Sequence, residues 1–353
     1  MNIDDLLRVA CESKASDLHC KVGNYPYLRV DGELSSLTQF PRISSEDMLN
    51  MAFSMMTNRQ KQKFKEETEL DMAYGVAGLG RFRVNVFQQR GNVGMVLRVI
   101  PTKIRTLDEL FMPKVLDKIC EERRGIALVT GTTGSGKSTT LAAMIDRVNS
   151  SRTDHIITIE DPIEFLHNHK SATIHQRELH SDTPSFALAL RAALRQAPKV
   201  IFVGELRDRE TMEMVLEAAE TGHLILSTLN SLDIANTVER IVSAFSTAEQ
   251  SSIRGRLAKT LRYVISQQLI PRRNGERTAI IEIFKANPRT AQYIECDDRS
   301  GRSLLEAVKN GAADGMQHFD GEIEKLVRSG MIDPETAQAY ARDPQALQTA
   351  LQA

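Results

Sequence analysis

Short apolar runs predict strands at residues 126–129, 156–159, 200–205, 223–230 and 278–283 of this chain. Runs of this length, apolar without regular polar alternation, are typical of strands buried on both faces of a parallel sheet. The segments between them carry apolar residues at helical spacing. The alternation of the two patterns predicts an α/β fold for residues 114–290.

The segments between these runs predict helices with recognisable ends. Residues 141–145 follow a glycine-rich turn and predict an amphipathic helix. Thr183 is predicted to cap a helix that runs to about residue 196. Gly222 is predicted to close a helix over residues 210–221, because glycine readily adopts the left-handed conformation found after helix ends.

Residues 248–269 are long, periodic and basic, and they predict a helical segment. Three interpretations of its charges remain open: a solvated face, a subunit contact or a pore lining. The last part of the chain, residues 291–353, is predicted to be a helical region without catalytic chemistry.

The first part of the chain mixes both patterns and predicts a small α+β domain over residues 1–100. Apolar residues at helical spacing mark helices near residues 3–10, 44–56 and 59–68, the second capped by Ser44. Strands are predicted at 27–30, before a tight turn at Asp31–Gly32, and at 71–76, 81–89 and 93–100. Residues 101–113 are predicted to be a linker and the hinge between the domains.

Composition narrows the class of protein. The 353 residues suit two domains, and a net charge of −1 argues against a surface that coats nucleic acid. The four cysteines lie far apart with no C-x-x-C pair, so neither a disulfide framework nor a zinc site is predicted. No apolar run approaches membrane-spanning length, and the acidic N-terminus lacks signal-peptide character. We therefore expect a cytoplasmic protein that meets the membrane only through partners.

The turn Gly131–Thr139, GTTGSGKST, has the form G-x-x-x-x-G-K-[ST] between a predicted strand and a predicted helix. Such turns direct backbone N–H groups and a helix N-terminus at a polyphosphate. Lys137 is expected to reach the β- and γ-phosphates of ATP, and the Ser138 hydroxyl is expected to bind Mg²⁺. A chance glycine-rich loop is the alternative. The residues expected to bind the nucleotide are Thr133, Gly134, Ser135, Gly136, Lys137, Ser138 and Thr139.

Carboxylates follow two of the predicted strands. Glu160, Asp161 and Glu164 follow one, and Glu205 ends another. Carboxylates at the carboxyl ends of parallel strands lie on the ligand side of an α/β sheet. There they orient an attacking water or hold Mg²⁺ through water. A plain acidic turn is the alternative for residues 160–164.

Four further side chains are candidates with weaker support. Thr228 has a hydroxyl that suits a γ-phosphate sensor, and His223 stands at the start of the same strand. A lone histidine at a strand end is more often structural than catalytic. Arg83 and Arg98 lie on predicted strands of one sheet, where a solvated sheet face is the commoner position for arginine.

Several motifs occur in order: GTTGSGKSTTLAAMID, TIEDPIEFLH, HQRELHSDT, VGELRD and AAETGHLILSTLN. With SDLH near the start, GRFRVNVF before the linker and GMQHFD near the end, the chain resembles the type II/IV secretion ATPases. Within that family it is similar to PilT-like pilus-retraction motors. The resemblance implies a PAS-like N-terminal domain, a RecA-like P-loop ATPase domain and a helical C-terminal tail.

The resemblance also implies roles for the candidate residues. Lys137 and Ser138 match the Walker A motif, and Glu205 matches the Walker B glutamate, which acts on Mg²⁺ through water. Glu160, Asp161 and Glu164 match the Asp box, and His223 matches the first position of the His box. Arg83 and Arg98 match arginines that reach the nucleotide across the domain boundary, which reverses their interpretation as a solvated pair. The implied catalytic residues are Glu160, Glu205, His223, Arg83 and Arg98.

The implied partners are those of a retraction motor. We expect a homo-hexamer that hydrolyses ATP between subunits, at the inner membrane through a type IV pilus platform protein. Pilin subunits would be extracted from the pilus. The chain lacks the cysteine-rich insert and the N-terminal extension usual in assembly motors, which favours retraction. Nucleic acid is not expected as a partner.

Three departures from the family pattern leave alternatives open. Asn230 stands where the His box has its second histidine, so any role of that imidazole is lost. Residues 195–199 replace a usually acidic segment and are expected near the ligand edge of the sheet. Residues 289–295 do not match the motif of principal retraction motors. The alternatives are an accessory PilU-type motor beside a paralogous retraction ATPase, a low-turnover ATP-binding adaptor, and a type IV secretion ATPase.

Overall fold

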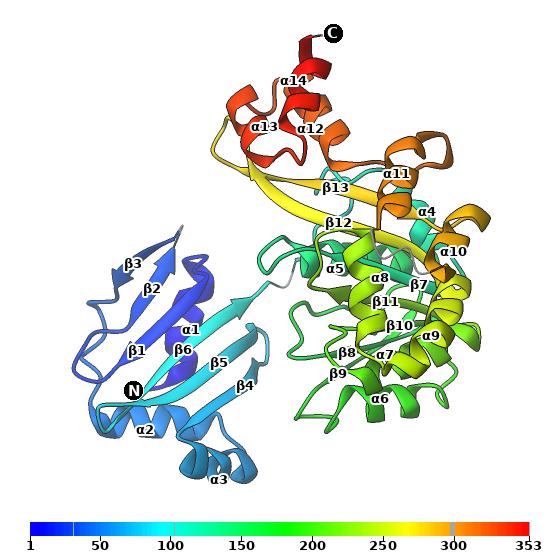
Figure 1. The fold of residues 1–353 in the computed structure, drawn as a ribbon. Coiled ribbons are helices and arrows are strands. Elements are labelled where there is room, and N and C mark those ends of the chain that lie inside the picture. Colours follow the sequence, from blue (N-terminus) through cyan, green and yellow to red (C-terminus); the bar gives the residue numbers. More distant parts are fainter. Residues whose placement is uncertain (31, 102, 297–300, 353) are drawn as a thin grey trace. The chain divides into compact units, whose positions relative to one another are not determined.

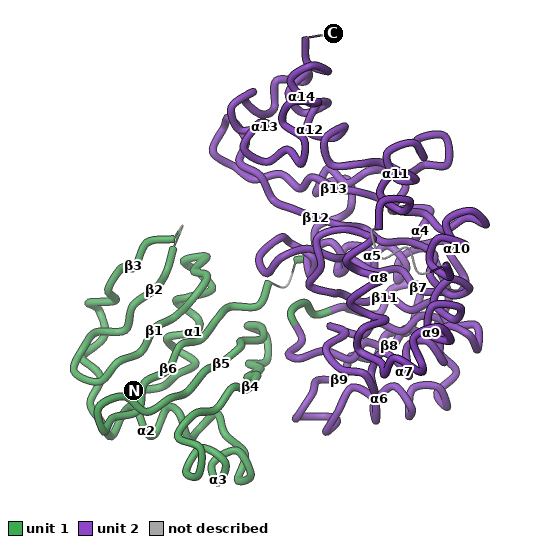
Figure 2. Tube along the Cα trace, in the orientation of Figure 1, with its two compact units in different colours: residues 1–103, 164–166 green, residues 104–163, 167–353 purple. Residues whose placement is uncertain are grey.

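The computed structural model describes residues 1–30, 32–101, 103–296 and 301–352. The chain divides into two compact units (Figure 2). The N-terminal unit holds residues 1–103 and 164–166, and the second unit holds residues 104–163 and 167–353. The turn predicted at Asp31–Gly32 and the linker predicted at 101–113 each include one residue, Asp31 or Thr102, that lies outside the described residues.

The N-terminal unit is an antiparallel sheet with helices packed against it (Figure 1). The strand order is β3-β2-β1-β6-β5-β4. Helix α1 buries Ile3, Leu6 and Leu7, the apolar positions whose helical spacing predicted it. Ser44 caps α2 in a capping box with Asp47, as predicted. The elements are α1 (Ile3–Glu12), β1 (Asp17–Lys21), β2 (Tyr27–Val30), β3 (Glu33–Ser36), α2 (Ser45–Ser54), α3 (Asn58–Glu67), β4 (Glu69–Val76), β5 (Gly80–Gln89) and β6 (Asn92–Ile100).

The second unit is organised around a mostly parallel sheet with the strand order β13-β12-β7-β11-β10-β8-β9. Only the pairing of β12 with β13 is antiparallel within this order. The central strands are buried along their whole length, as continuous apolar runs predict. The strands are β7 (Gly125–Thr130), β8 (His155–Glu160), β9 (Thr173–Glu178), β10 (Val200–Val203), β11 (Leu224–Leu229), β12 (Leu261–Pro271) and β13 (Arg277–Lys285).

Helices cover both faces of this sheet, so side chains alternate between two cores. Leu128 and Val203 pack with α6, α7, α8 and α9 on one face. Val129 and Phe202 pack with α4 and α5 on the other. The helices are α4 (Val115–Glu121), α5 (Lys137–Ser151), α6 (Phe186–Ala193), α7 (Arg209–Glu220), α8 (Ile234–Ser243), α9 (Thr247–Thr260), α10 (Pro288–Glu295) and α11 (Arg302–Asn310).

The C-terminal helices form a separate small core at one end of β12 and β13 (Figure 1). Ile270 and Ile280 from the two strands pack there against Phe319, Ile323 and residues of the last two helices. The elements after α11 are the 3-10 helix η1 (Ala312–Asp314), α12 (Phe319–Arg328), α13 (Pro334–Tyr340) and α14 (Pro344–Gln352). Within the described residues, no helix combines the length and apolar character needed to cross a bilayer.

The predicted helix over residues 248–269 is wrong in its second half. Helix α9 ends at Thr260, and the chain continues directly as strand β12. This strand pairs with β7 on one side and β13 on the other. One partner, β7, is distant in sequence, so helical periodicity alone could not reveal that pairing, whereas β13 follows β12 after a short turn. The charges left open at this segment also have partners, since Arg254 pairs with Glu239 and Arg256 with Glu220.

Three smaller predictions also need correction. Helix α6 begins at Phe186 with Ser185 as its cap, two residues after the predicted cap at Thr183. Residues 141–145 are helical but wholly buried rather than amphipathic, because α5 lies against the sheet and against α4. Strand β9 was not predicted at all; its sequence, TIHQRE, is mostly polar, which suits the sheet edge it occupies.

Candidate nucleotide site

The turn between β7 and α5 presents the groups that bind phosphate. Helix α5 begins at Lys137, and no side chain caps it at Gly136. An uncapped first turn offers N–H donors at the positive end of the helix. The Ser135 hydroxyl oxygen is buried, and it has no hydrogen-bond partner among the described residues. Residues 132–134, at the tip of the turn, are exposed.

Lys137 is held inside this turn. Its Nζ donates to the carbonyl oxygen of Gly131 at 2.9 Å and to that of Thr132 at 2.8 Å. The ammonium group therefore lies along the loop rather than extending into solvent. A positive charge in this position adds to the field of the helix N-terminus.

Gln267 of β12 supports the turn through hydrogen bonds, a role that the sequence did not indicate. Its buried amide donates from Nε2 to the Ser135 carbonyl at 2.7 Å and accepts from the Thr140 hydroxyl at 2.7 Å. The backbone passes so close that a Cβ at Gly131 would lie 2.3 Å from the Gln267 carbonyl oxygen. A Cβ at Gly136 would lie 2.8 Å from Gln267 Nε2. Glycine at both positions is thus a packing requirement.

Glu205 follows β10 on a backbone fixed from both sides. The Gly204 N–H donates to the Ile159 carbonyl at 2.8 Å, and the Thr228 hydroxyl donates to the Gly204 carbonyl at 2.6 Å. The Leu206 N–H donates to the Thr228 carbonyl at 3.0 Å. Thr228 therefore secures the turn that carries Glu205, and its hydroxyl is committed to this bond rather than open toward a phosphate.

The Glu205 carboxylate has a partner on each oxygen. Asn230 Nδ2 donates to Oε1 at 2.6 Å, and Arg207 Nε donates to Oε2 at 2.6 Å. Arg207 also donates from Nη1 to Asp161 at 3.2 Å, which links the two acidic segments. These carboxylates raise the pKa of Arg207. The Arg207 side chain is 56% exposed, so its ion pairs are weak and easily exchanged.

Glu160 lies at the end of β8, buried in the sheet edge. Its Oε1 accepts from the Thr158 hydroxyl at 2.6 Å and from Gln176 Nε2 at 3.1 Å. Gln176 belongs to β9, a strand that the sequence did not predict. Two neutral donors on one oxygen fix the orientation of the carboxylate.

Parallel register gathers these groups at one edge of the sheet. Val203 is level with Ile159 of β8 and Ser227 of β11, and Ser227 is level with Leu128 of β7. One to three residues further along these strands come Glu160, Glu205, Thr228 and the start of the glycine-rich turn. The phosphate loop, Glu160, Glu205, Asp161 and Asn230 therefore share the carboxyl edge, where α/β sheets bind ligands.

His223 does not join this group within the chain. It precedes β11, whose six residues separate it from the carboxyl edge by about 20 Å. Its Nδ1 lies 2.9 Å from the Ala218 carbonyl, at the end of α7. His223 therefore lies at the C-terminus of α7 rather than at the nucleotide edge.

The segment 195–199 is also far from the site, contrary to our expectation. Lys199 precedes β10, its N–H donates to the carbonyl of His155, and its carbonyl accepts from the N–H of Leu224. His155 and Leu224 are the first residues of β8 and β11. The segment therefore lies at the amino edge of the sheet, so its altered charge is remote from Glu160 and Glu205.

Arg83 and Arg98 belong to the N-terminal unit and face each other directly across β5 and β6. Arg98 Nε donates to Asp17 at 3.1 Å, and Arg83 Nη2 lies 3.8 Å from Asp71. The Arg98 side chain is 68% exposed and the Arg83 side chain 44% exposed. They form a paired positive patch on one sheet, held by carboxylates on neighbouring strands.

The second unit fits a magnesium nucleoside triphosphate. The buried Ser135 hydroxyl, the uncapped start of α5 and the Lys137 ammonium provide anion-binding chemistry. Ser138 on the same turn and the carboxylates Glu160 and Glu205 provide the oxygen ligands that Mg²⁺ prefers, directly or through water. Sequence reasoning found these groups. It missed Gln267, more than a hundred residues away, and it noted Arg207 in VGELRD without assigning it a role.

Comparisons with known proteins show which family the whole chain resembles. Residues 1–329 match the family model described as type II/IV secretion system protein. The chain is 41% identical to the type IV pilus retraction ATPase PilT of Pseudomonas aeruginosa, over 98% of this chain and 99% of that protein. It is also 41% identical to the type IV pilus ATPase PilU of the same organism, over 97% and 89%. The crystal structure of the pilus retraction motor PilT with bound ADP aligns with a TM-score of 0.91 and 41% identity, covering 99% of each chain.

The support that Gln267 gives the turn leads to a first prediction. Gln267→Leu leaves the Ser135 carbonyl and Thr140 hydroxyl without their buried partner, which costs about 1–3 kcal/mol. We expect weaker binding of a fluorescent adenine nucleotide and a lower melting temperature. The matched control is Gln268→Leu, the next residue on β12, which is only half-buried. Equal nucleotide affinity in the two variants would contradict the conclusion that Gln267 supports the phosphate-binding turn.

Asn230 provides a second prediction. Asn230→Ala removes the donor to Glu205 Oε1, so the carboxylate loses orientation and turnover should fall about tenfold, the effect of roughly one lost charge-assisted hydrogen bond. Nucleotide affinity should change little, because the loop is untouched. Asn236→Ala, which removes a side chain bonded to Asp233 instead, is the control. A steady-state ATPase assay distinguishes the variants, and unchanged turnover in Asn230→Ala would refute the role.

Proposed function

We propose that this chain, which belongs to the type II/IV secretion system protein family, is an ATP-hydrolysing motor that retracts type IV pili. The observation that carries the proposal is Glu205, fixed at the carboxyl edge of the sheet between Asn230 and Arg207. A protein that only bound ATP would have no need of an oriented carboxylate there. The names and activities of PilT and PilU support the same conclusion.

In this proposal the glycine-rich turn binds the triphosphate. Hydrogen bonds come from the N–H groups at the start of α5 and from the Ser135 hydroxyl, and Lys137 neutralises part of the negative charge. Lys137 exchanges the carbonyls of Gly131 and Thr132 for phosphate oxygens, so its hydrogen bonds are replaced rather than lost. Ser138 and, through water, Glu205 hold Mg²⁺, which when bound neutralises charge on the phosphates.

Glu205 is assigned to the attacking water. A carboxylate accepts a proton or orients a water only if its lone pairs point correctly, and Asn230 fixes Oε1 for that purpose. Arg207 covers Oε2 through an exposed ion pair. Because such pairs contribute little free energy, Arg207 can leave Oε2 when water and nucleotide arrive. Glu160, held by Thr158 and Gln176, is the second fixed negative charge of the site.

Arg83 and Arg98 are proposed to supply positive charge to the γ-phosphate in a homo-hexamer. The transition state of phosphoryl transfer spreads negative charge over the phosphoryl oxygens, and an arginine there contributes about 10³–10⁵-fold. Both side chains are exposed and lie in the N-terminal unit. In this proposal they act on a nucleotide bound by the same chain or by a neighbour. The linker at 101–113 is the proposed hinge.

The adaptor alternative loses its main support. It rested on Asn230 in place of a histidine, yet the asparagine amide donates directly to Glu205. It rested also on residues 195–199, which lie at the remote edge of the sheet, and on residues 289–295, a departure that remains and lies in α10. We therefore propose turnover, in the cytoplasm at the inner membrane through a pilus platform protein. Identity is equal to PilT and PilU, so both a principal role and an accessory role beside a paralogous retraction ATPase fit the proposal.

The catalytic assignment predicts a separation of binding from turnover. Glu205→Gln keeps the hydrogen-bonding shape but removes the charge, so ATPase activity should fall about 10²–10⁴-fold while nucleotide still binds. Lys137→Ala should lose both ATPase activity and nucleotide binding. The control is Glu210→Gln, an exposed glutamate five residues further along. Rates and nucleotide affinity measured on folded, purified variants test this. Wild-type turnover in Glu205→Gln would remove the mechanism.

If an arginine of one subunit acts on the nucleotide of its neighbour, two inactive variants should restore each other's ATPase activity. Arg98→Ala and Lys137→Ala should each be inactive alone. The first lacks the arginine, and the second lacks the lysine that binds the nucleotide phosphates. Mixed rings contain sites in which an intact arginine meets an intact loop. We expect measurable ATPase activity in the mixture, with Arg59→Ala, an exposed arginine of α3, active on its own as the control. Additive inactivity at every mixing ratio would place the arginine and the loop of each site in the same chain.

A further inference from the structure

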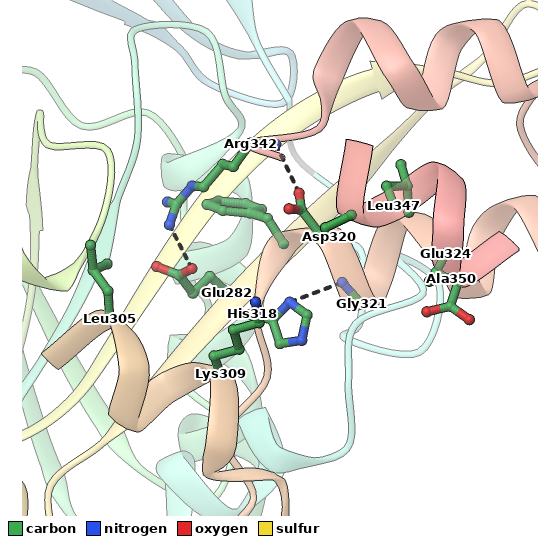
Figure 3. Close-up of a pocket in the computed structure, with 12 residues that line it drawn as sticks. Glu282, Leu305, Lys309, His318, Asp320, Gly321, Glu324, Arg342, Leu347 and Ala350 are labelled. Atoms are coloured by element: carbon green, nitrogen blue, oxygen red, sulfur yellow. Dashed lines mark hydrogen bonds and ion pairs between the residues drawn. The ribbon is translucent and has the colours of Figure 1, made fainter. Parts of the chain in front are cut away.

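A cavity of about 300 Å³ lies among the C-terminal helices (Figure 3). Strand β13 contributes Glu282, and α11 contributes Leu305 and Lys309. The start of α12 and the last helix, α14, form the remaining wall. The volume is at the lower end of the range for ligand pockets, so an occupant must be small.

Glu282 is the buried charged group of this cavity. Its residue is 3% exposed, and within the described part of the chain its Oε1 has no hydrogen-bond partner. The other oxygen, Oε2, accepts from Arg342 Nη1 at 2.8 Å (Figure 3). A buried carboxylate oxygen without a donor is costly, so a donor from a ligand would stabilise it.

Among the residues that the structure describes, the neighbouring charged groups do not donate to that oxygen. Arg342 is committed to Oε2, to the Leu232 carbonyl at 3.0 Å and to the ring of Phe319, 4.5 Å from its centre. Asp320 accepts from the backbone N–H groups of Arg342 and Asp343. Lys309 is exposed, so water screens its charge.

The electrostatic environment of Glu282 favours a cation. Burial, Asp233 and Asp320 raise the pKa of its carboxyl to about 7, although Arg342 acts in the opposite direction. Burial also lowers the pKa of His318, whose Nδ1 accepts from the Gly321 N–H at 3.0 Å, so this ring is neutral. The titratable and charged groups around Glu282 are Asp233, Lys309, His318, Asp320, Glu324 and Arg342.

Apolar atoms complete the lining. Leu305, Phe319 and Leu347 contribute side chains, and Ala346 and Ala350 leave space along α14. A bare metal ion would find only one unpaired oxygen here, whereas an organic cation would bury its apolar part as well. An organic cation therefore suits all three features of the cavity: the unpaired acceptor, the acidic surroundings and the apolar wall.

We infer that this cavity is a binding site for a small organic cation with N–H donors, such as a primary ammonium, anchored on Glu282 Oε1. The site is distinct from the nucleotide edge and does not depend on the proposed function. Nearby Arg342 joins Glu282 to the Leu232 carbonyl, two residues after Asn230.

Ligand-observed saturation-transfer NMR on the full-length protein tests the site directly. The probes are benzylammonium, its neutral analogue benzyl alcohol and its anionic analogue phenylacetate, which share the ring and differ in charge. We expect saturable transfer to benzylammonium and little to the other two. Equal transfer to all three would reduce the cavity to a nonspecific apolar surface and overturn the inference.

Two variants locate the binding. Glu282→Gln should weaken benzylammonium binding about 10- to 100-fold, the range for loss of a charge-assisted hydrogen bond. Ala346→Phe, at an exposed position of α14, fills the cavity while leaving the Glu282–Arg342 pair intact. Gln348→Phe, exposed on the same helix but not lining the cavity, is the control. Undiminished binding in both Glu282→Gln and Ala346→Phe would overturn the assignment, even if one variant folds poorly.

The pH dependence provides an independent readout. The proton and the cation compete for Glu282, whose pKa in the folded protein is raised to about 7. Affinity should therefore be highest above that value and fall about tenfold from about pH 8 to about pH 6. Benzylammonium keeps its own charge over this range. Affinity that is constant with pH, or that rises on acidification, would contradict an ionised Glu282 as the anchor.

Discussion

The parallel pairing of β7, β11, β10 and β8 is the constraint on which the site depends. Because neighbouring strands run in the same direction and in register, their carboxyl ends meet at one edge. The glycine-rich turn follows one strand, and Glu160 and Glu205 end or follow two others. A shift of one residue in any pairing would turn a buried side chain toward the wrong core and move a site residue with it. Packing of the two cores thus fixes the positions of the chemistry.

Within this frame, small polar side chains set the orientation of the charged ones. Asn230 holds Glu205, Thr228 fixes the backbone beside it, and Gln267 supports the phosphate-binding turn. An amide at position 230 provides a donor that does not titrate near neutral pH, whereas an imidazole there would. The departure from the family pattern at this residue therefore changes the pH response expected of the site more than its geometry.

Much of this arrangement was predictable from sequence, and the failures have physical causes. The phosphate turn and the strands before Glu160 and Glu205 were predicted because each depends on local pattern: glycine spacing or a continuous apolar run. Strand β12 was predicted as helix because its residues show helical spacing and because β7, the strand that pairs with one of its sides, is remote in sequence. Gln267 was missed for the same reason. His223 and segment 195–199 were expected near the ligands, but strand direction places both at the opposite edge.

The most direct test of the central claim is steady-state ATP hydrolysis by the purified full-length protein, measured with Mg²⁺ and with its assembly state recorded in the same sample. The account holds that Glu205 is oriented for water attack and that neighbouring arginines complete the site. It predicts sustained turnover that accompanies the assembled ring. Tight ATP binding by a fully assembled ring without turnover would contradict the account, because the oriented carboxylate would then have no catalytic purpose.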